Sequence, residues 1–138
     1  MWWVYASLSA LFAALTAVFA KAGLSNINSN LATGIRTIVI VVMIWVIILA
    51  TGEAKGVNNL SRQNIFFLVI SGIATGLSWL FYFKALQLGN VSQVAPIDKL
   101  SIVLTIILSV LFLGETINLK TALGAGLIVA GALVLIWK

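Results

Sequence analysis

Apolar residues dominate five long stretches of the chain, and short polar segments separate them. Each stretch provides about the 20 mostly apolar residues that a helix needs to cross the hydrocarbon core of a bilayer. None of the stretches alternates apolar and polar residues with the period of two that a strand of a membrane barrel shows. The pattern therefore predicts five transmembrane helices, at about residues 2–20, 31–51, 64–86, 91–113 and 119–137.

The polar connections indicate where these helices end. The run 25–30 follows the first stretch, and the segment "GEAKGVNNLSRQ" forms the longest predicted loop. Gly89 and Asn90 predict a tight reversal, and Asn118 is a candidate cap for the last helix. No Lys or Arg precedes the first stretch, which is also longer than the core of a signal peptide, so we interpret it as a span.

The composition identifies the solvent of this fold. Of the 138 residues, 62% are hydrophobic and 8% are charged, whereas about a quarter of the residues in a soluble domain are charged. A soluble core of this length could not cover so much apolar surface. We therefore expect an all-α, multi-pass integral membrane protein, with residues 1–138 as a single domain of five transmembrane helices.

The charges and the missing residue types exclude several kinds of function. The net charge is +5, but the eight Lys and Arg are scattered, which is typical of helix ends anchored at lipid headgroups rather than of a nucleic-acid surface. The chain has no Cys and no His, so we expect no metal site and no cofactor. It has three acidic residues, two of them in predicted loops, so it offers no paired carboxylates and we expect no enzyme.

The charges in the loops give almost no bias for orientation. Five spans put the two termini on opposite sides of the membrane. One side then holds Lys55, Arg62 and Lys120, and the other holds Lys21, Lys84 and Lys138, with Arg36 added if its side chain extends outward. Because Lys and Arg in short loops set the direction of insertion, this balance favours dual topology, in which copies insert both ways and pair antiparallel. The alternative is one fixed orientation set by details that the count misses.

Polar side chains form stripes along three of the predicted helices. At about 100° per residue, residues three or four apart share a helix face. The stripes consist of Ser71, Thr75, Ser78 and Tyr82, with Trp79 on the flank; Asp98, Ser101, Thr105 and Ser109; and Tyr5, Ser9 and Thr16. Together they could line a cavity. The alternative is that each hydroxyl bonds a backbone carbonyl one turn back and merely tolerates lipid.

Small residues mark a second kind of face. Gly72 and Gly76 form a GxxxG pair in the third helix, and Ala122, Gly126 and Ala130 repeat the small-xxx-small spacing in the fifth. Both patterns indicate close helix packing. They do not say whether the neighbour belongs to the same chain or to a second copy.

The fourth stretch contains an adjacent acid and base, Asp98 and Lys99, just after Pro96. Asp98 lies about seven residues, or roughly 10 Å, inside the predicted helix, too deep for simple headgroup contact. Adjacent residues point about 100° apart, so we do not expect Asp98 and Lys99 to pair with each other. Pro96 removes an amide donor and predicts a kink, and broken helices often form the binding sites of transporters. The alternative is structural: both charges bond neighbouring helices, or Arg36, and hold the bundle in register.

The run "GLSWLFYFKALQLGNVSQVAPIDKLSIVLTIILSVLFLGE", Gly76 to Glu115, resembles the EamA module of the drug/metabolite transporter superfamily. In that module a third helix ends in an aromatic segment and "AL..G", a proline opens the next helix, and a Gly-Glu pair closes it. The N-terminal half, with "ALFAALTAVFAKAGL" and then Arg36 at the start of the second helix, is also similar. The resemblance covers essentially the whole chain.

The resemblance implies an architecture. Typical members carry two five-helix modules of opposite topology, ten helices in all, and this chain has one. It is similar to the short single-module bacterial and archaeal members, which implies an antiparallel homodimer in a prokaryotic cell (inner) membrane. It also implies a central cavity and export of small metabolites, amino acids or drugs. The related four-helix multidrug proteins hold cations with a glutamate in their first helix, whereas the first predicted helix here contains no acid.

These observations lead to two hypotheses of different class. The first is a secondary transporter that moves a small molecule by alternating access. Asp98 is then the candidate group for proton or substrate binding, and the candidate lining residues are Arg36, Lys99, Trp79, Tyr82, Ser78, Ser101, Thr105, Tyr5 and Ser9. The second is a non-transporting membrane subunit that packs with a partner membrane protein through its glycine faces. A passive channel is a third possibility.

Overall fold

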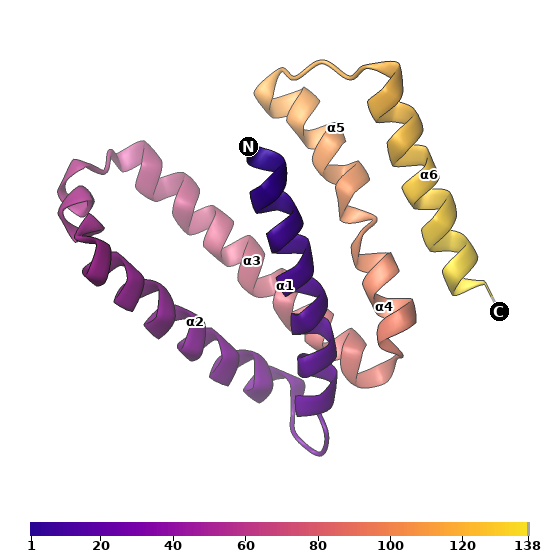
Figure 1. Cartoon of the computed structure of the whole chain (residues 1–138), viewed down its shortest axis with the longest axis horizontal. Coiled ribbons are helices and arrows are strands. Elements are labelled where there is room, and N and C mark those ends of the chain that lie inside the picture. Colours follow the sequence, from indigo (N-terminus) through magenta and orange to yellow (C-terminus); the bar gives the residue numbers. More distant parts are fainter. Residues whose placement is uncertain (138) are drawn as a thin grey trace. The chain divides into compact units, whose positions relative to one another are not determined.

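Helices make up almost all of the structure, a computed structural model that describes residues 1–137 (Figure 1). Five spans in this range are long and apolar enough to cross a membrane. The elements are α1 (Trp2–Gly23), α2 (Ser29–Thr51), the 3₁₀ helix η1 (Glu53–Asn59), α3 (Arg62–Leu88), α4 (Val91–Asp98), α5 (Ser101–Leu113) and α6 (Leu119–Ile136). The predicted all-helical fold with five membrane spans is thus confirmed, with α4 and α5 together forming the fourth span.

Local chemistry sets the helix ends. Asn28 caps α2, because its side chain accepts a hydrogen bond from the Asn30 amide at 2.8 Å. The predicted cap of α6 is confirmed, since the side chain of Asn118 accepts from the Thr121 amide at 2.8 Å. Gly52 ends α2 and Gly114 ends α5, with φ of 74° and 68°, in the left-handed region that glycine adopts at little cost.

The fourth span is interrupted, but the interruption lies beyond the proline. Pro96 is inside α4, and the α-helix stops at Asp98 and resumes at Ser101. Across the gap the backbone follows a tighter spiral: the amides of Leu100, Ile102 and Val103 donate to carbonyl oxygens three residues earlier, at 3.0–3.1 Å. A short 3₁₀ turn within a longer helix is a common mark of a hinge.

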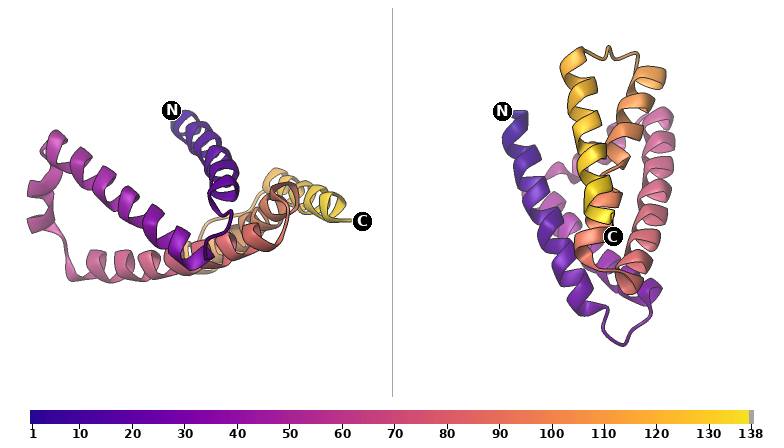
Figure 2. Two further views of the ribbon diagram at one scale, coloured as in Figure 1. Left: turned by 90° about the horizontal axis from the view of Figure 1, so that it is seen from below. Right: turned by 90° about the vertical axis from the view of Figure 1, so that its right-hand side faces the viewer.

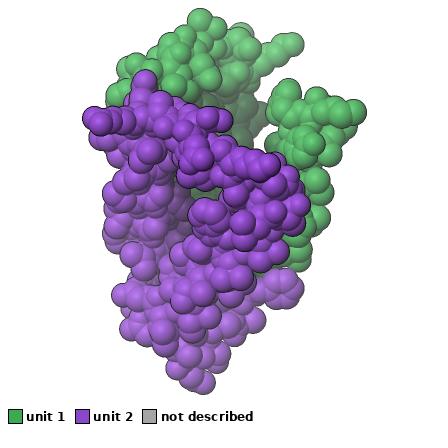
Figure 3. Space-filling model, turned by 90° about the vertical axis from the view of Figure 1, so that its left-hand side faces the viewer, with its two compact units in different colours: residues 1–17, 88–138 green, residues 18–87 purple. Residues whose placement is uncertain are grey.

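The chain separates into two compact units, coloured in Figure 3. One contains residues 18–87, in which η1 connects α2 to α3. The other contains residues 1–17 and the chain from residue 88 onward. Within this second unit α6 runs back along α4 and α5 as the returning arm of a hairpin (Figure 2). The single five-helix domain expected from the sequence stays a prediction.

Few side chains are buried. In the unit of residues 18–87 the buried apolar residues are Leu24, Phe83 and Leu86, together with the polar Ser29 and Thr33. In the other unit Ala17 and Ala132 are buried. Most large apolar side chains along the spans are exposed, as expected for helices whose outer solvent is lipid.

Candidate functional site

Arg36 stacks on aromatic rings of α3. Its guanidinium carbon lies 3.4 Å from the centroid of the Trp79 ring and 5.4 Å from that of Phe83. Trp79 also contacts Tyr82 and Phe83 edge to face, with centroids 5.5 and 5.8 Å apart. The cation therefore lies over a rigid aromatic platform, the arrangement of a cation–π contact. The structure thus brings three of the predicted lining residues together: Arg36, Trp79 and Tyr82.

A junction of three helix ends supports this platform. Phe83 and Leu86 are 2% and 0% exposed, and Leu24 beyond α1 is also buried. The Lys21 ammonium of α1 donates to the carbonyl of Leu86, in the last turn of α3. Gln87 donates through Nε2 to the carbonyl of Ile27, in the loop before α2, at 2.9 Å. The Leu86 carbonyl, in the last turn of α3, lacks a helical partner, and the two bonds together fasten the end of α1 and the α1–α2 loop to α3.

Asp98 and Lys99 form an ion pair, with Lys99 Nζ 3.2 Å from a carboxylate oxygen of Asp98. The expectation that these neighbours would not pair was wrong. It assumed a continuous α-helix, whereas the pair stands where α4 stops, and the long lysine side chain bends back to its neighbour. Pairing lowers the cost of placing two charges within a membrane span.

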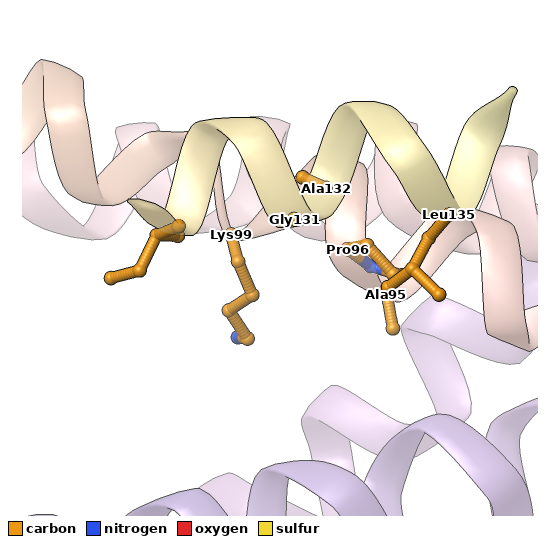
Figure 4. A pocket seen from close by; sticks show the side chains of 7 residues that line it. Ala95, Pro96, Lys99, Gly131, Ala132 and Leu135 are labelled. Carbon is orange, nitrogen blue, oxygen red and sulfur yellow. The ribbon is translucent and has the colours of Figure 1, made fainter. Parts of the chain in front are cut away.

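A groove between α4 and α6 passes beside this pair. Its volume is about 410 Å³, and the residues that line it are Ala95, Pro96, Lys99, Ile128, Gly131, Ala132 and Leu135. In Figure 4 the Lys99 side chain extends into the open space beside α6, while Ala95 and Pro96 lie near Leu135. The walls are apolar, with Lys99 the one charged residue among those that line the groove, and its ammonium is paired with Asp98.

The hydroxyl stripes are largely satisfied within their own helices. Thr75 donates to the Ser71 carbonyl at 2.8 Å, Thr105 to Ser101 at 2.9 Å, and Ser109 to Ile106 at 2.9 Å. These bonds match the alternative interpretation, in which each hydroxyl bonds its own backbone. Four further stripe residues are exposed: Tyr5, Ser9, Ser78 and Ser101.

The glycine faces are open. A methyl group added at Gly72, Gly76 or Gly126 would meet nothing within 4 Å beyond its own helix backbone. Within its own unit, therefore, each of these glycines contacts no neighbouring helix, and their packing role stays a prediction.

The predicted site residues thus form two groups, one in each unit. Arg36, Trp79 and Tyr82 belong to residues 18–87, and Asp98 and Lys99 belong to the other unit. A common cavity lined by all the stripes stays a prediction.

Comparison with known protein families decides the class. The model of the EamA-like transporter family matches residues 1–137. The chain belongs to this family. EamA membership and the five apolar spans make it an integral, multi-pass membrane protein with a general role in transport. This class agrees with the expectation that the chain is not an enzyme.

Two relatives of this EamA chain are similar to it in sequence. A protein of Sinorhizobium sp., named an uncharacterized transporter in the cobO 3′ region, is 54% identical over 134 residues, which cover 97% of this chain and 95% of the relative. An uncharacterized protein of Methanocaldococcus jannaschii is 30% identical over 81 residues, 59% of each chain. The bacterial relative fits a prokaryotic membrane. No solved structure matches the chain.

Sequence reasoning on this EamA chain missed the contribution of two elements. Phe83 lies under Arg36, and its position four residues after Trp79 on the same face of α3 could have indicated this. The α6 wall of the groove, Ile128, Gly131, Ala132 and Leu135, follows a helical spacing that was not singled out. The small-residue pattern around Gly126 led the interpretation to a different face of α6.

Proposed function

We propose that this EamA chain is a secondary transporter that moves a small metabolite, amino acid or drug-like compound by alternating access, acting as an antiparallel homodimer. The observation that carries the proposal is the Asp98–Lys99 ion pair at a break in a membrane span of a member of a transporter family. Charges within a span normally mark a substrate or ion pathway, and discontinuous helices provide such sites in many transporters.

The position of the glycine pair supports an antiparallel dimer. Thr75 stands at the middle of α3, 13 residues from Arg62 and 13 from Leu88. Gly72 and Gly76 flank this midpoint and have no neighbour within the unit of residues 18–87. A two-fold axis in the membrane plane, of the kind that relates inverted repeats, brings equivalent helices together at their midpoints. Two copies of α3 could therefore cross closely at the glycine pair.

Cross-linking tests this dimer directly, because the chain contains no cysteine. Cysteine introduced at Gly76 should form a disulfide with the same position of a second copy. Cysteine at Phe66, near one end of α3, should not cross-link to itself in an antiparallel pair but should do so in a parallel one. Fusions to reporters that work on only one side of the membrane test dual topology: activity on one side alone would contradict it.

Counterflow in liposomes tests the transport function. Purified protein should exchange at least one compound of a panel of amino acids, organic acids and organic cations with saturable kinetics. Asp98→Asn should abolish coupled transport while folding and dimerisation persist. Because this variant leaves Lys99 without its partner, the control is Asp98→Asn with Lys99→Gln, which removes both charges. Wild-type flux in the double variant would show that Asp98 only compensates Lys99.

The same experiment separates the transporter from the alternative, a non-transporting subunit that packs with a partner membrane protein. The open face at Gly72 and Gly76 would serve either function. Saturable exchange by the protein alone requires the transporter. Failure of exchange over the whole panel, with the protein folded, favours the subunit, and flux without saturation or counterflow favours a passive channel.

A further inference from the structure

Arg36 is a cation within a membrane span, and its hydrogen-bonding groups have no partner within the unit of residues 18–87. It lies seven residues after the start of α2, about 10 Å along the helix. Within the unit of residues 18–87, no hydrogen bond and no ion pair involves its guanidinium. The one acid in the unit of residues 18–87 is Glu53, beyond the opposite end of α2. Arg36 is half-buried, and a charge withdrawn from water without hydrogen bonds is costly, so the guanidinium N–H groups are suited to a ligand.

The stacking on Trp79 leaves one part of the guanidinium accessible. A guanidinium is planar, and its N–H groups point outward in that plane. Stacking at 3.4 Å covers one face of the plane but not the N–H edge. That edge matches the two oxygens of a carboxylate, which arginine binds with two parallel hydrogen bonds.

The platform also fixes where the cation lies. Trp79 is nine residues from the end of α3, about 13 Å along the helix, and is therefore at least as deep as the Arg36 backbone. An arginine that extended to lipid headgroups would leave Trp79. The edge-to-face contacts of Trp79 with Tyr82 and Phe83, and the burial of Phe83, hold the platform in place. A preorganised cation loses little entropy when it binds a ligand.

We propose that Arg36 on the Trp79 platform binds the carboxylate of the transported solute, so that the substrates are small organic acids present as anions. This inference rests on the proposed transport function and names its substrate class. The guanidinium edge would hold the carboxylate, and the exposed parts of Tyr82 and Trp79 would contact the apolar part of the solute.

Binding to purified protein tests this assignment. The detergent is a maltoside, which contains no phosphate, and the probes are matched pairs: benzoate with benzamide, and propionate with propionamide. A variant that keeps Trp79 as its single tryptophan reports on the platform by fluorescence; the tryptophans replaced by Phe are Trp2, Trp3, Trp45 and Trp137. The carboxylates should change this fluorescence and raise the melting temperature. Their amides should bind at least tenfold more weakly.

Substitutions at Arg36 give the sharper test. Arg36→Gln removes a charge from the span, so the variant should still insert and fold, and it should lose carboxylate binding. Arg36→Lys keeps the charge but loses the planar pair of donors, and should weaken binding about tenfold. Lys55→Gln in η1 removes the same charge from an exposed position and should bind as the wild type does.

Three results would overturn the assignment. The first is equal binding of carboxylate and amide, and the second is unchanged binding by Arg36→Gln. The third is a Trp79 response only to anionic phospholipid in nanodiscs, which would identify a lipid phosphate as the ligand. Counterflow separates this proposal from the transport function. Exchange of neutral or cationic solutes that Arg36→Gln leaves intact refutes the carboxylate site alone, whereas Arg36-dependent binding without exchange of any solute refutes transport alone.

Discussion

Leu86 tests whether the junction of helix ends stabilises the fold. Its side chain is fully buried where α1, α2 and α3 meet. Leu86→Ala removes that side chain but keeps the backbone carbonyl that accepts from Lys21. The matched control is Leu88→Ala, two residues further along α3, where the side chain is 77% exposed.

The expected loss of unfolding free energy for Leu86→Ala depends on whether the side chain is transferred out of water or out of lipid. In water-soluble cores Leu→Ala costs about 2.7–5.0 kcal/mol, partly from lost packing. Three carbon groups at about 0.8 kcal/mol each account for roughly 2.4 kcal/mol of this as transfer out of water. Lipid is as apolar as leucine, so only the packing part remains for a side chain deep in the bilayer. Leu86 lies two residues from the end of α3, near the interface, so we expect a loss of about 1–3 kcal/mol.

Unfolding in mixed micelles measures this loss. Titration with sodium dodecyl sulfate, followed by circular dichroism, gives the free energy of unfolding of each variant. Leu88→Ala should change it by less than about 0.5 kcal/mol, as exposed substitutions usually do. If Leu86→Ala and Leu88→Ala cost the same, the junction does not stabilise the fold and the reasoning is refuted.

Two further substitutions test other parts of the structure. Asn118→Ala removes the cap of α6 and should lower the free energy of unfolding, measured in the same micelles, by about 1 kcal/mol. The control is Asn59→Ala, because the Asn59 side chain caps no helix. Equal losses in the two variants would show that the cap contributes nothing. Pro96→Ala restores an amide donor for the Ser92 carbonyl, so amide hydrogen exchange at Lys99 and Leu100 should slow, and counterflow should slow too if the break works as a hinge. Unchanged exchange at both amides would show that Pro96 does not cause the break.

The sequence was sufficient for the helices because lipid imposes a simple rule. A span must be apolar and long, and the polar runs after Leu24 and Thr51 break that rule visibly. The helix ends moved by a few residues where a contact decides them: α1 continues past Ala20 to Gly23, and Lys21 in this last turn bonds the Leu86 carbonyl of α3. The sequence around Lys21 does not indicate this partner, which lies 65 residues further along the chain.

The candidate site was predicted by residue type more than by geometry. Arg36, Trp79 and Tyr82 were chosen as polar or aromatic residues of spans, but helical periodicity gives the face of a residue and not the helix that it meets. The contacts of Trp79 with Arg36 and with Tyr82 are therefore known only from the structure. The Asp98–Lys99 pair was missed for a different reason. The α-helical angle of 100° between neighbours was assumed at residues where the α-helix stops.

The 3₁₀ turn after Asp98 gives the fourth span a way to rotate about its own axis. Each residue turns about 120° and rises about 2.0 Å in a 3₁₀ helix, against 100° and 1.5 Å in an α-helix. Conversion of three residues from 3₁₀ to α-helix would rotate the part of the span beyond them by roughly 60° and shorten the span by about 1.5 Å along its axis. The hydroxyls of Thr105 and Ser109 would then swing around the helix axis relative to Asp98, while α4 keeps its packing against α6.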